Sequence, residues 1–242
     1  MRAPGACVLA LLACSSALGV AAAAAQSMLP RLFPRPAELV LGPPEQTTDL
    51  HPCRFGIERA GAWAAALLDT DMWAVPPDTA FDLYRPLILR GAGCDRLGSG
   101  GSGAFVQLSV ALNASIPAAA AADERERERY AIDVVGADAI LTVGSYAGLL
   151  RGLEKFSQLV MGASPRAATD LRIPASVRIR DAPSFQHRGV MLDTARNFIP
   201  IDTLKNVIDG LCFSSMNFLH LHLTDSSSFP FNLTRRYGPA IS

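Results

Sequence analysis

Two short apolar runs, with an amphipathic segment between them, form the clearest pattern of hydrophobic and polar positions in the chain. The runs at 187–193 and 218–224 are rich in apolar residues and end in polar or turn residues, so each predicts a strand. A strand, a helix and a second strand in this order form a βαβ unit. Its strands should lie parallel, and its crossover should be right-handed.

The segment between these strands predicts a helix. Its apolar residues recur at positions i, i+3, i+4 and i+7, as Leu204, Val207, Ile208 and Leu211. Asp202 is the expected N-cap, because its short side chain accepts hydrogen bonds from N–H groups of the first turn, and Pro200 lies just ahead of it. Cys212 is expected to pack on this helix as a small apolar residue.

Polar residues follow both predicted strands. The loops that follow parallel strands lie at the same edge of a sheet, where barrels and open α/β sheets bind ligands. We therefore expect Asp193, Thr194 and Arg196 to face Asp225 and Ser226.

Side chains alternate between the two faces of the second strand. Its leucines share one face and are expected to pack on helices, while His220 and His222 share the other and are expected to point into a barrel interior. Buried imidazoles need hydrogen-bond partners, which Asp225 or Asp193 could supply.

Helix and strand patterns also precede residue 187. Strands are predicted at 38–41, 105–112, 130–135, 139–143 and 176–180, and helices at 57–68, 78–89 and 145–160. The strands within 130–143 should form a hairpin, and Pro86 should interrupt its helix. The glycine-rich residues 91–103 suggest a linker, and the mixed-charge run 123–129 suggests a solvated loop or a short exposed helix.

Two motifs of the βαβ unit resemble the start of the catalytic barrel of β-N-acetylhexosaminidases, glycoside hydrolase family 20. They are RGVMLDTARNF at 188–198 and MNFLHLHLTD at 216–225, followed by SFP at 228–230. The helix GLLRGLEKFSQLV at 148–160 resembles the last helix of the non-catalytic domain that precedes this barrel. The resemblance implies an α+β N-terminal domain at 26–183, a sheet with helices packed on one face. The incomplete start of a (β/α)8 barrel would follow at 184–242, because a whole barrel takes roughly 200 to 250 residues.

The resemblance also assigns a substrate site. Arg196 matches the arginine that holds the hydroxyls of a terminal non-reducing N-acetylhexosamine, work that suits a fork of donors that keeps its charge. Asp193, His222 and Asp225 are expected to support this pocket. Family members cleave by substrate assistance: the 2-acetamido oxygen attacks the anomeric carbon, an aspartate orients that group, and an adjacent glutamate protonates the leaving oxygen.

That aspartate–glutamate pair does not occur after Asp193, where the acidic residues are Asp202, Asp209 and Asp225. We therefore expect no catalytic residue in this chain, with the proton donor beyond Ser242. The chain would be the inactive N-terminal portion of a truncated β-N-acetylhexosaminidase.

Two other interpretations stay open. One is a non-catalytic glycan-binding product that binds N-acetylhexosamine weakly through Arg196. The other is a metal-dependent amidohydrolase, because His220 and His222 have the spacing of a barrel zinc site to which Asp225 could add an oxygen.

The charge composition of the chain limits the classes of molecule that it is expected to bind. Basic and acidic residues both number 22, and this zero net charge argues against nucleic acid as a partner. The expected partners are terminal N-acetylglucosamine or N-acetylgalactosamine residues of glycans. No cofactor and no metal is expected, and the family resemblance implies a homodimer in the full-length enzyme.

The amino terminus predicts a secretory route, ending in a lysosome, at the cell surface or outside the cell. Residues 1–25 have the layout of a cleaved signal peptide, with an uncleaved signal anchor as the alternative. In an oxidising compartment Cys53 and Cys94 are the expected disulfide pair. Asn113 and Asn232 begin sequons for N-glycosylation.

Overall fold

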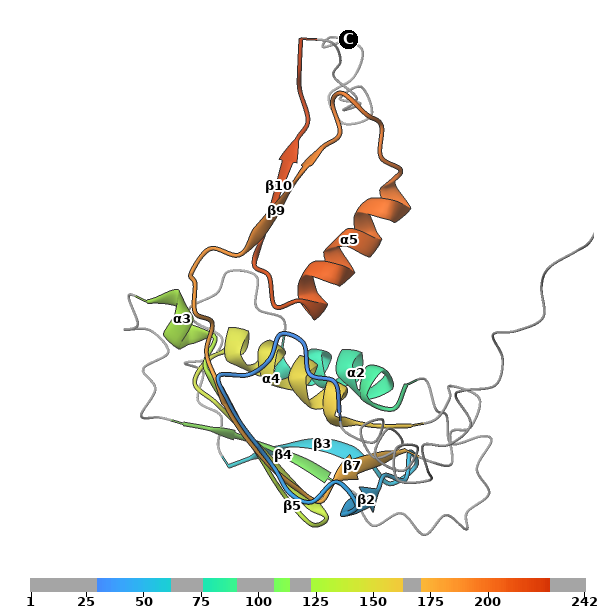
Figure 1. Cartoon of the computed structure of the whole chain (residues 1–242), viewed down its shortest axis with the longest axis vertical. Helices are drawn as coiled ribbons and strands as arrows, with labels where there is room; N and C mark the ends of the chain where they lie inside the picture. Colours follow the sequence, from blue (N-terminus) through green and yellow to red (C-terminus); the bar gives the residue numbers. More distant parts are fainter. Residues whose placement is uncertain (1–29, 62–75, 91–106, 114–122, 163–170, 227–242) are drawn as a thin grey trace, which may run out of the picture.

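The computed structural model describes residues 30–61, 76–90, 107–113, 123–162 and 171–226. Figure 1 shows a sheet covered by helices and, beside it, a smaller unit of two strands and one helix. The signal peptide, the 91–103 linker, Cys94 and Asn232 lie outside the described residues, so those predictions are not tested.

Six strands form the main sheet, in the order β1-β8-β5-β6-β4-β3. Their bounds are β1 Glu38–Leu41, β3 Gly56–Ala60, β4 Gln107–Leu112, β5 Tyr130–Val135, β6 Asp138–Val143 and β8 Ser176–Asp181. Neighbours from β1 to β6 pair antiparallel, whereas β4 pairs parallel with both β6 and β3. The hairpin of β5 and β6 and the strand at Glu38–Leu41 are confirmed.

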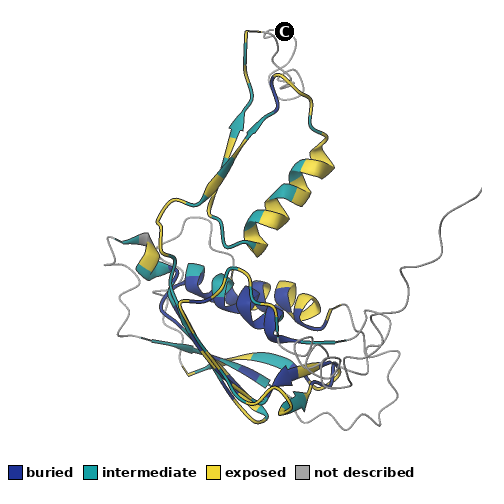
Figure 2. Ribbon diagram, viewed as in Figure 1, coloured by how far each residue is buried: buried dark blue, intermediate teal, exposed yellow. Residues whose placement is uncertain are grey.

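Alternating side chains give this sheet one buried face. In β5, Tyr130, Ile132 and Val134 are buried, whereas Asp133 lies on the opposite face and pairs with Arg180 at 2.8 Å. Figure 2 shows the buried residues concentrated between the sheet and the helices above it.

Two helices, α2 Pro77–Ile88 and α4 Tyr146–Leu159, cover the buried face of the sheet (Figure 1). The Oγ of Ser145 accepts a hydrogen bond from the N–H of Gly148 at 3.0 Å and so caps α4. Leu149, Leu153 and Phe156 are fully buried, which confirms the apolar stripe predicted for this helix. The mixed-charge run holds a four-residue helix, α3 Glu124–Arg127.

Two helix predictions upstream need correction. Residues 57–60 form β3 instead of a helix, because parallel pairing with β4 satisfies their backbone groups and outweighs the helix preference of the alanine-rich segment. Residues 62–68 lie outside the described ranges. Pro86 does not interrupt α2, since it lies in the last turn and the helix continues to Ile88.

A second, two-stranded sheet was not predicted. It pairs β2 Thr47–Asp49 antiparallel with β7 Arg172–Pro174. Strands of three residues are too short to show an alternating pattern.

The smaller unit contains β9 Gly189–Asp193, α5 Ile201–Phe213 and β10 Phe218–His222. The two strands are parallel, with Gly189 opposite Phe218 and Asp193 opposite His222, which confirms the predicted βαβ unit. Gly189 permits the close approach of the strands, because a Cβ there would lie 2.8 Å from the carbonyl oxygen of Phe218.

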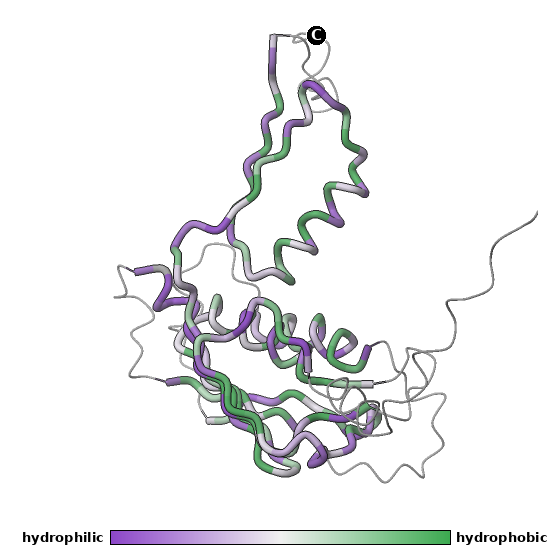
Figure 3. Tube along the Cα trace, in the orientation of Figure 1, coloured by the Kyte–Doolittle hydropathy of each residue, from purple (hydrophilic) through white to green (hydrophobic). Residues whose placement is uncertain are grey.

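Two predictions about α5 are wrong. Pro200 occupies the N-cap position, so Asp202 lies within the first turn and pairs with Lys205 at 3.1 Å instead of capping the helix. Cys212 is exposed and does not pack in an interior. In the described part of the chain α5 has no buried residue, although Figure 3 shows many hydrophobic positions along the unit. No described helix is both long enough and apolar enough to span a membrane.

Candidate functional site

The carboxyl ends of β9 and β10 lie side by side, as predicted. The N–H of Thr194 donates to the carbonyl oxygen of His222 at 3.0 Å, and the Thr194 hydroxyl donates to the same oxygen at 3.2 Å. These bonds extend the pairing one step beyond β9. They fix the start of the Asp193–Arg196 loop against the end of β10.

Asp193 organises the loop that follows β9. Its Oδ1 accepts hydrogen bonds from the N–H groups of Ala195 and Arg196, both at 3.0 Å, and its Oδ2 accepts one from Nε of Arg196. The backbone hydrogen bond from Arg196 is the largest of the causes that lower the pKa of Asp193 below its ordinary value of 3.8. The carboxylate is therefore ionised at neutral pH, where it holds the loop and the guanidinium together.

The Arg196 side chain remains 61% exposed while it pairs with Asp193. The hydrogen bond and charge of Asp193 raise the pKa of the guanidinium, and the charge of Asp225 raises it further. Arg196 thus lies within the electrostatic reach of Asp225, on the shared edge. Among the described residues, hydrogen bonds to the guanidinium are confined to its Nε. Its two terminal nitrogens are therefore available to oxygens of a ligand.

His222 and Asp225 complete the edge on the β10 side. Nε2 of His222 lies 3.5 Å from Oδ2 of Asp225, and the Ser226 hydroxyl donates to Oδ1 of Asp225 at 3.0 Å. Asp225 and Asp193 were both considered as partners for the histidine rings. The ring of His222 contacts the carboxylate of Asp225. His220 is exposed on the same strand.

The edge gives little support to a metal site. Within the described ranges, no group of three or more His, Cys, Asp or Glu side chains is arranged to hold a metal ion. The interpretation based on His220 and His222 therefore has no complete ligand set in this part of the chain.

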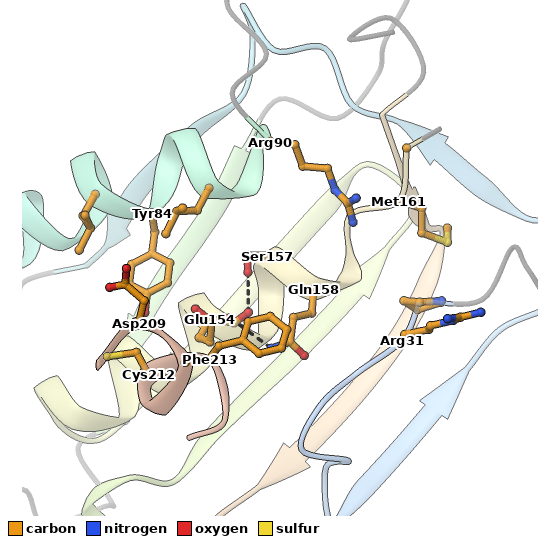
Figure 4. A pocket seen from close by; sticks show the side chains of 15 residues that line it. Arg31, Tyr84, Arg90, Glu154, Ser157, Gln158, Met161, Asp209, Cys212 and Phe213 are labelled. Carbon is orange, nitrogen blue, oxygen red and sulfur yellow. Dashed lines mark hydrogen bonds between the residues drawn. The ribbon is translucent and has the colours of Figure 1, made fainter. Parts of the chain in front are cut away.

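A cavity of about 1010 Å³ lies elsewhere, between α2 and α4 on one side and the end of α5 on the other. Figure 4 shows Tyr84 of α2, Glu154 of α4, and Asp209 and Phe213 of α5 around it. None of the four residues predicted for the sugar pocket lines this cavity. Charged side chains line this cavity too, namely Arg31, Arg90, Glu154 and Asp209, but no residue of the motifs at 188–198 and 216–225 does.

Sequence reasoning missed the burial of Glu128. Glu128 belongs to the run that was predicted to be solvated, yet it is only 6% exposed and pairs with Arg151 and Arg188. Acidic and basic residues alternate along 124–129, so no local pattern distinguishes the buried Glu128 from its neighbours.

Comparisons with known proteins find similar sequences and structures among glycoside hydrolases. Residues 185–238 match the family described as glycosyl hydrolase family 20, catalytic domain. Over 107 residues the chain is 42% identical to the β-hexosaminidase subunit beta of Mus musculus, covering 44% of this chain and 19% of the relative. Over 99 residues it is 41% identical to a chitooligosaccharidolytic β-N-acetylglucosaminidase of Bombyx mori, covering 41% of this chain and 16% of the relative.

A solved structure extends the likeness to most of the chain. The family 20 β-N-acetylhexosaminidase of Streptomyces coelicolor A3(2) superposes with a TM-score of 0.54 and 25% identity, covering 81% of this chain and 35% of that enzyme. The chain thus spans less than a fifth of the length of the curated relatives named above and about a third of this structure. Residues 185–238 are thus similar to the catalytic domain of glycosyl hydrolase family 20, and the relatives and the solved structure named here are a β-hexosaminidase subunit, a β-N-acetylglucosaminidase and a β-N-acetylhexosaminidase by their descriptions.

Proposed function

We propose that this chain is the N-terminal part of a β-N-acetylhexosaminidase and binds a terminal non-reducing N-acetylhexosamine at the edge formed by β9 and β10. The observation that carries the proposal is the pairing of Arg196 with Asp193 on the same edge as His222 and Asp225. Matches to β-hexosaminidases over this segment support it.

Arg196 would contact the sugar hydroxyls. Asp193 holds the guanidinium through Nε and the loop through two backbone N–H groups, so the fork is oriented before a ligand arrives. Such pre-organisation reduces the entropy lost on binding. On the opposite side of the edge, Asp225 supplies a carboxylate that can accept hydrogen bonds from sugar hydroxyls.

The whole protein would hydrolyse terminal N-acetylglucosamine or N-acetylgalactosamine by substrate-assisted, retaining catalysis. The acid that protonates the leaving oxygen would come from a segment beyond this chain. Asp202 and Asp209 are unsuited to that role, because both lie on α5 rather than on the loops that follow β9 and β10. The 242 residues would bind sugar without cleaving it.

The proposed organisation follows from the same resemblance. Residues 26–183 would form the non-catalytic α+β domain, and residues 184–242 would begin the barrel. A signal peptide at 1–25, a Cys53–Cys94 disulfide and glycans on Asn113 and Asn232 would fit a secretory route. A homodimer of the full-length enzyme belongs to this proposal too.

A non-catalytic glycan-binding protein is the second candidate. It is favoured by the Asp193–Arg196 pair, which is formed within the described residues of this chain. Both candidates predict sugar binding by the chain, so binding alone does not distinguish them.

Two measurements separate the candidates. Reading the coding sequence past Ser242 should reveal an in-frame continuation with an Asp-Glu pair if the protein is a hydrolase, whereas a stop codon favours the glycan-binding product. The continued protein should release a fluorogenic aglycone from an N-acetyl-β-glucosaminide, and Arg196→Lys should lower its kcat/KM strongly, because one ammonium cannot reproduce the guanidinium fork. Hydrolysis by the 242 residues alone would contradict the proposal that the acid lies elsewhere.

A further inference from the structure

A buried carboxylate joins the two parts of the molecule. The Glu128 side chain is 8% exposed, and its Oε2 lies 2.7 Å from Nε of Arg151 and 2.5 Å from Nη2 of Arg188. Both arginine side chains are less than a fifth exposed, at 17% and 16%. Arg151 belongs to α4 in the helical layer, whereas Arg188 immediately precedes β9 in the βαβ unit.

The two arginines also hold the backbone of the βαβ unit. Nη2 of Arg151 crosses from α4 and donates to the carbonyl oxygen of Met216 at 2.9 Å. Nε of Arg188 donates to the carbonyl oxygen of Ser215 at 2.8 Å, and its Nη1 donates to that of Phe185 at 2.6 Å. One glutamate thus fixes two guanidinium groups that together bind the segments entering β9 and β10. We call Arg151, Glu128 and Arg188 the clasp.

The clasp lies at the amino ends of both strands. The N–H of Arg188 donates to the Asn217 side chain at 2.9 Å, and the carbonyl oxygen of Arg188 accepts from the N–H groups of Asn217 and Phe218. The sugar edge lies at the carboxyl ends of the same two strands, since Asp193 closes β9 and His222 closes β10. Four residues of β9, Gly189 to Leu192, therefore separate Arg188 of the clasp from Asp193 of the site.

The described residues of α5 include no buried one, although its last turn lines the cavity beside α2 and α4. Among the described strands, β9 and β10 pair only with each other. A two-stranded sheet is marginal in water without further packing. Ionic groups that are buried and fully hydrogen-bonded supply directional contacts that apolar packing lacks.

We propose that Glu128 is a positioning residue of the sugar site: through Arg151 and Arg188 it holds the amino ends of β9 and β10, and so sets where Arg196 presents its guanidinium. The inference rests on the proposed function. It gives the non-catalytic α+β layer a direct part in sugar binding.

Glu128→Gln tests this in the 242-residue chain. The variant keeps the shape and an acceptor, but leaves two buried cations facing each other without a counter-charge. Glu126→Gln is the matched control, because Glu126 lies two residues away and pairs with Arg129 at 2.6 Å, with both side chains more than two-fifths exposed.

Two readouts are taken on each protein. The first is amide hydrogen exchange at Thr194 and in β10, compared with exchange in β5 and β6. The second is the dissociation constant for methyl N-acetyl-β-glucosaminide. We expect Glu128→Gln to speed exchange at Thr194 and in β10 at least tenfold, to leave β5 and β6 unchanged, and to weaken sugar binding about fivefold or more. Glu126→Gln should change neither readout.

Three results would overturn the positioning role: an equal rise of exchange in all strands, no rise at all, or faster exchange with unchanged sugar affinity. If Glu128→Gln does not fold, Arg188→Lys replaces it; this variant keeps the charge, loses the fork and should give the same local pattern in weaker form. Failure of the wild-type chain to bind the glycoside would refute the proposed function instead, and the exchange pattern would still decide whether the clasp orders the unit.

Discussion

The side chain of Asp193 accepts hydrogen bonds from the loop after β9 and from the Arg196 guanidinium, so it orders both. The lowered pKa of Asp193 means that the folded chain binds a proton there less readily than the unfolded chain does. Its stabilising contribution is therefore complete above the unfolded value, near pH 4, and is lost as the pH falls through the lower folded value.

Asp193→Asn should weaken sugar binding several-fold, because the amide keeps the loop geometry but loses the charge that holds Arg196. Wild-type sugar affinity should stay constant from neutral pH down to about pH 4, because the pKa of Asp193 lies below 3.8, and should decline only at lower pH. Isothermal titration with an N-acetylglucosaminide from neutral pH down to about pH 3 measures both effects. A steep wild-type decline that begins above pH 5 would show that another group controls the site.

Lys155 also makes stability depend on pH, in a more alkaline range than Asp193. It is 1% exposed, its Nζ donates to the carbonyl oxygen of Pro34 at 2.6 Å, and burial lowers its pKa to about 8. Between pH 8 and about pH 10 the unfolded chain holds more protons at this site than the folded chain, so Lys155 makes stability rise with pH.

Lys155→Met should remove that rise. The difference in unfolding free energy between wild type and variant should shift in favour of wild type by about 1–2 kcal/mol from pH 7.5 to pH 10. Parallel denaturant titrations at both pH values provide the comparison. A difference that does not change with pH would mean that Lys155 keeps an ordinary pKa.

What the sequence predicts about single residues depends on how local the signal is. Arg196 and Asp193 lie in one contiguous motif, and their pairing needs only the loop between them. Glu128 acts through Arg151 and Arg188, which lie 23 and 60 positions away, so only the folded chain brings the three together. The predicted Asp202 cap is wrong because the helix begins at Ile201, with Pro200 at the N-cap, two residues earlier than a cap at Asp202 requires.

Packing of α4 depends on glycines that let it approach its neighbours. A Cβ on Gly148 would lie 2.5 Å from the backbone oxygen of Arg129, next to the clasp. By contrast, a Cβ on Gly210 in α5 would meet nothing within 4 Å. These two helical glycines thus differ in surroundings, although the sequence gives no sign of it.

Gly148→Ala should destabilise the fold by about 1–3 kcal/mol, because the methyl group collides with backbone that has no freedom to rotate away. Gly210→Ala should be neutral or stabilise by up to about 1 kcal/mol, because alanine favours a helix. Thermal unfolding monitored by circular dichroism tests the pair. Equal effects of the two substitutions would contradict the close approach of α4 to residues 127–129.

Elements with a long periodic pattern were predicted well, as α4 and the β5–β6 hairpin show. Strands that form only because another strand lies beside them were not predicted. β3 overlaps the start of the segment 57–68, which was predicted to be a helix, and becomes a strand because β4 lies beside it. β2 and β7 pair only with each other among the described strands. Propensity describes the isolated segment, whereas pairing decides its final state.

At the scale of the whole molecule, stability and function occupy different parts. The described hydrophobic core cluster lies in the main sheet, in α2 and α4, in β7 and in segments next to these elements, and it includes no residue of the βαβ unit. The candidate sugar site lies on that unit, whose strands are only half-buried or exposed. The clasp is the buried polar link between the two parts.

Leu153→Ala in the core should therefore cost about 2–5 kcal/mol, because it opens a cavity beneath a fully buried helix face. Ile208→Ala on α5, where the side chain is 46% exposed, should cost less than about 1 kcal/mol. Denaturant titrations followed by far-ultraviolet circular dichroism give the unfolding free energies of the two variants for comparison. Similar losses would show that α5 is buried in solution against a surface that this structure does not contain.

The sugar edge itself is tested most directly by titrating the 242-residue chain with methyl N-acetyl-β-glucosaminide and following backbone amide shifts. The account predicts shifts at residues 193–196 and 222–226, and a dissociation constant about tenfold or more weaker for Arg196→Lys. Arg178→Lys is the control, since Arg178 is 63% exposed and pairs with Asp133 on the outer face of the main sheet. Shifts confined to other residues, or an affinity that Arg196→Lys leaves unchanged, would contradict it.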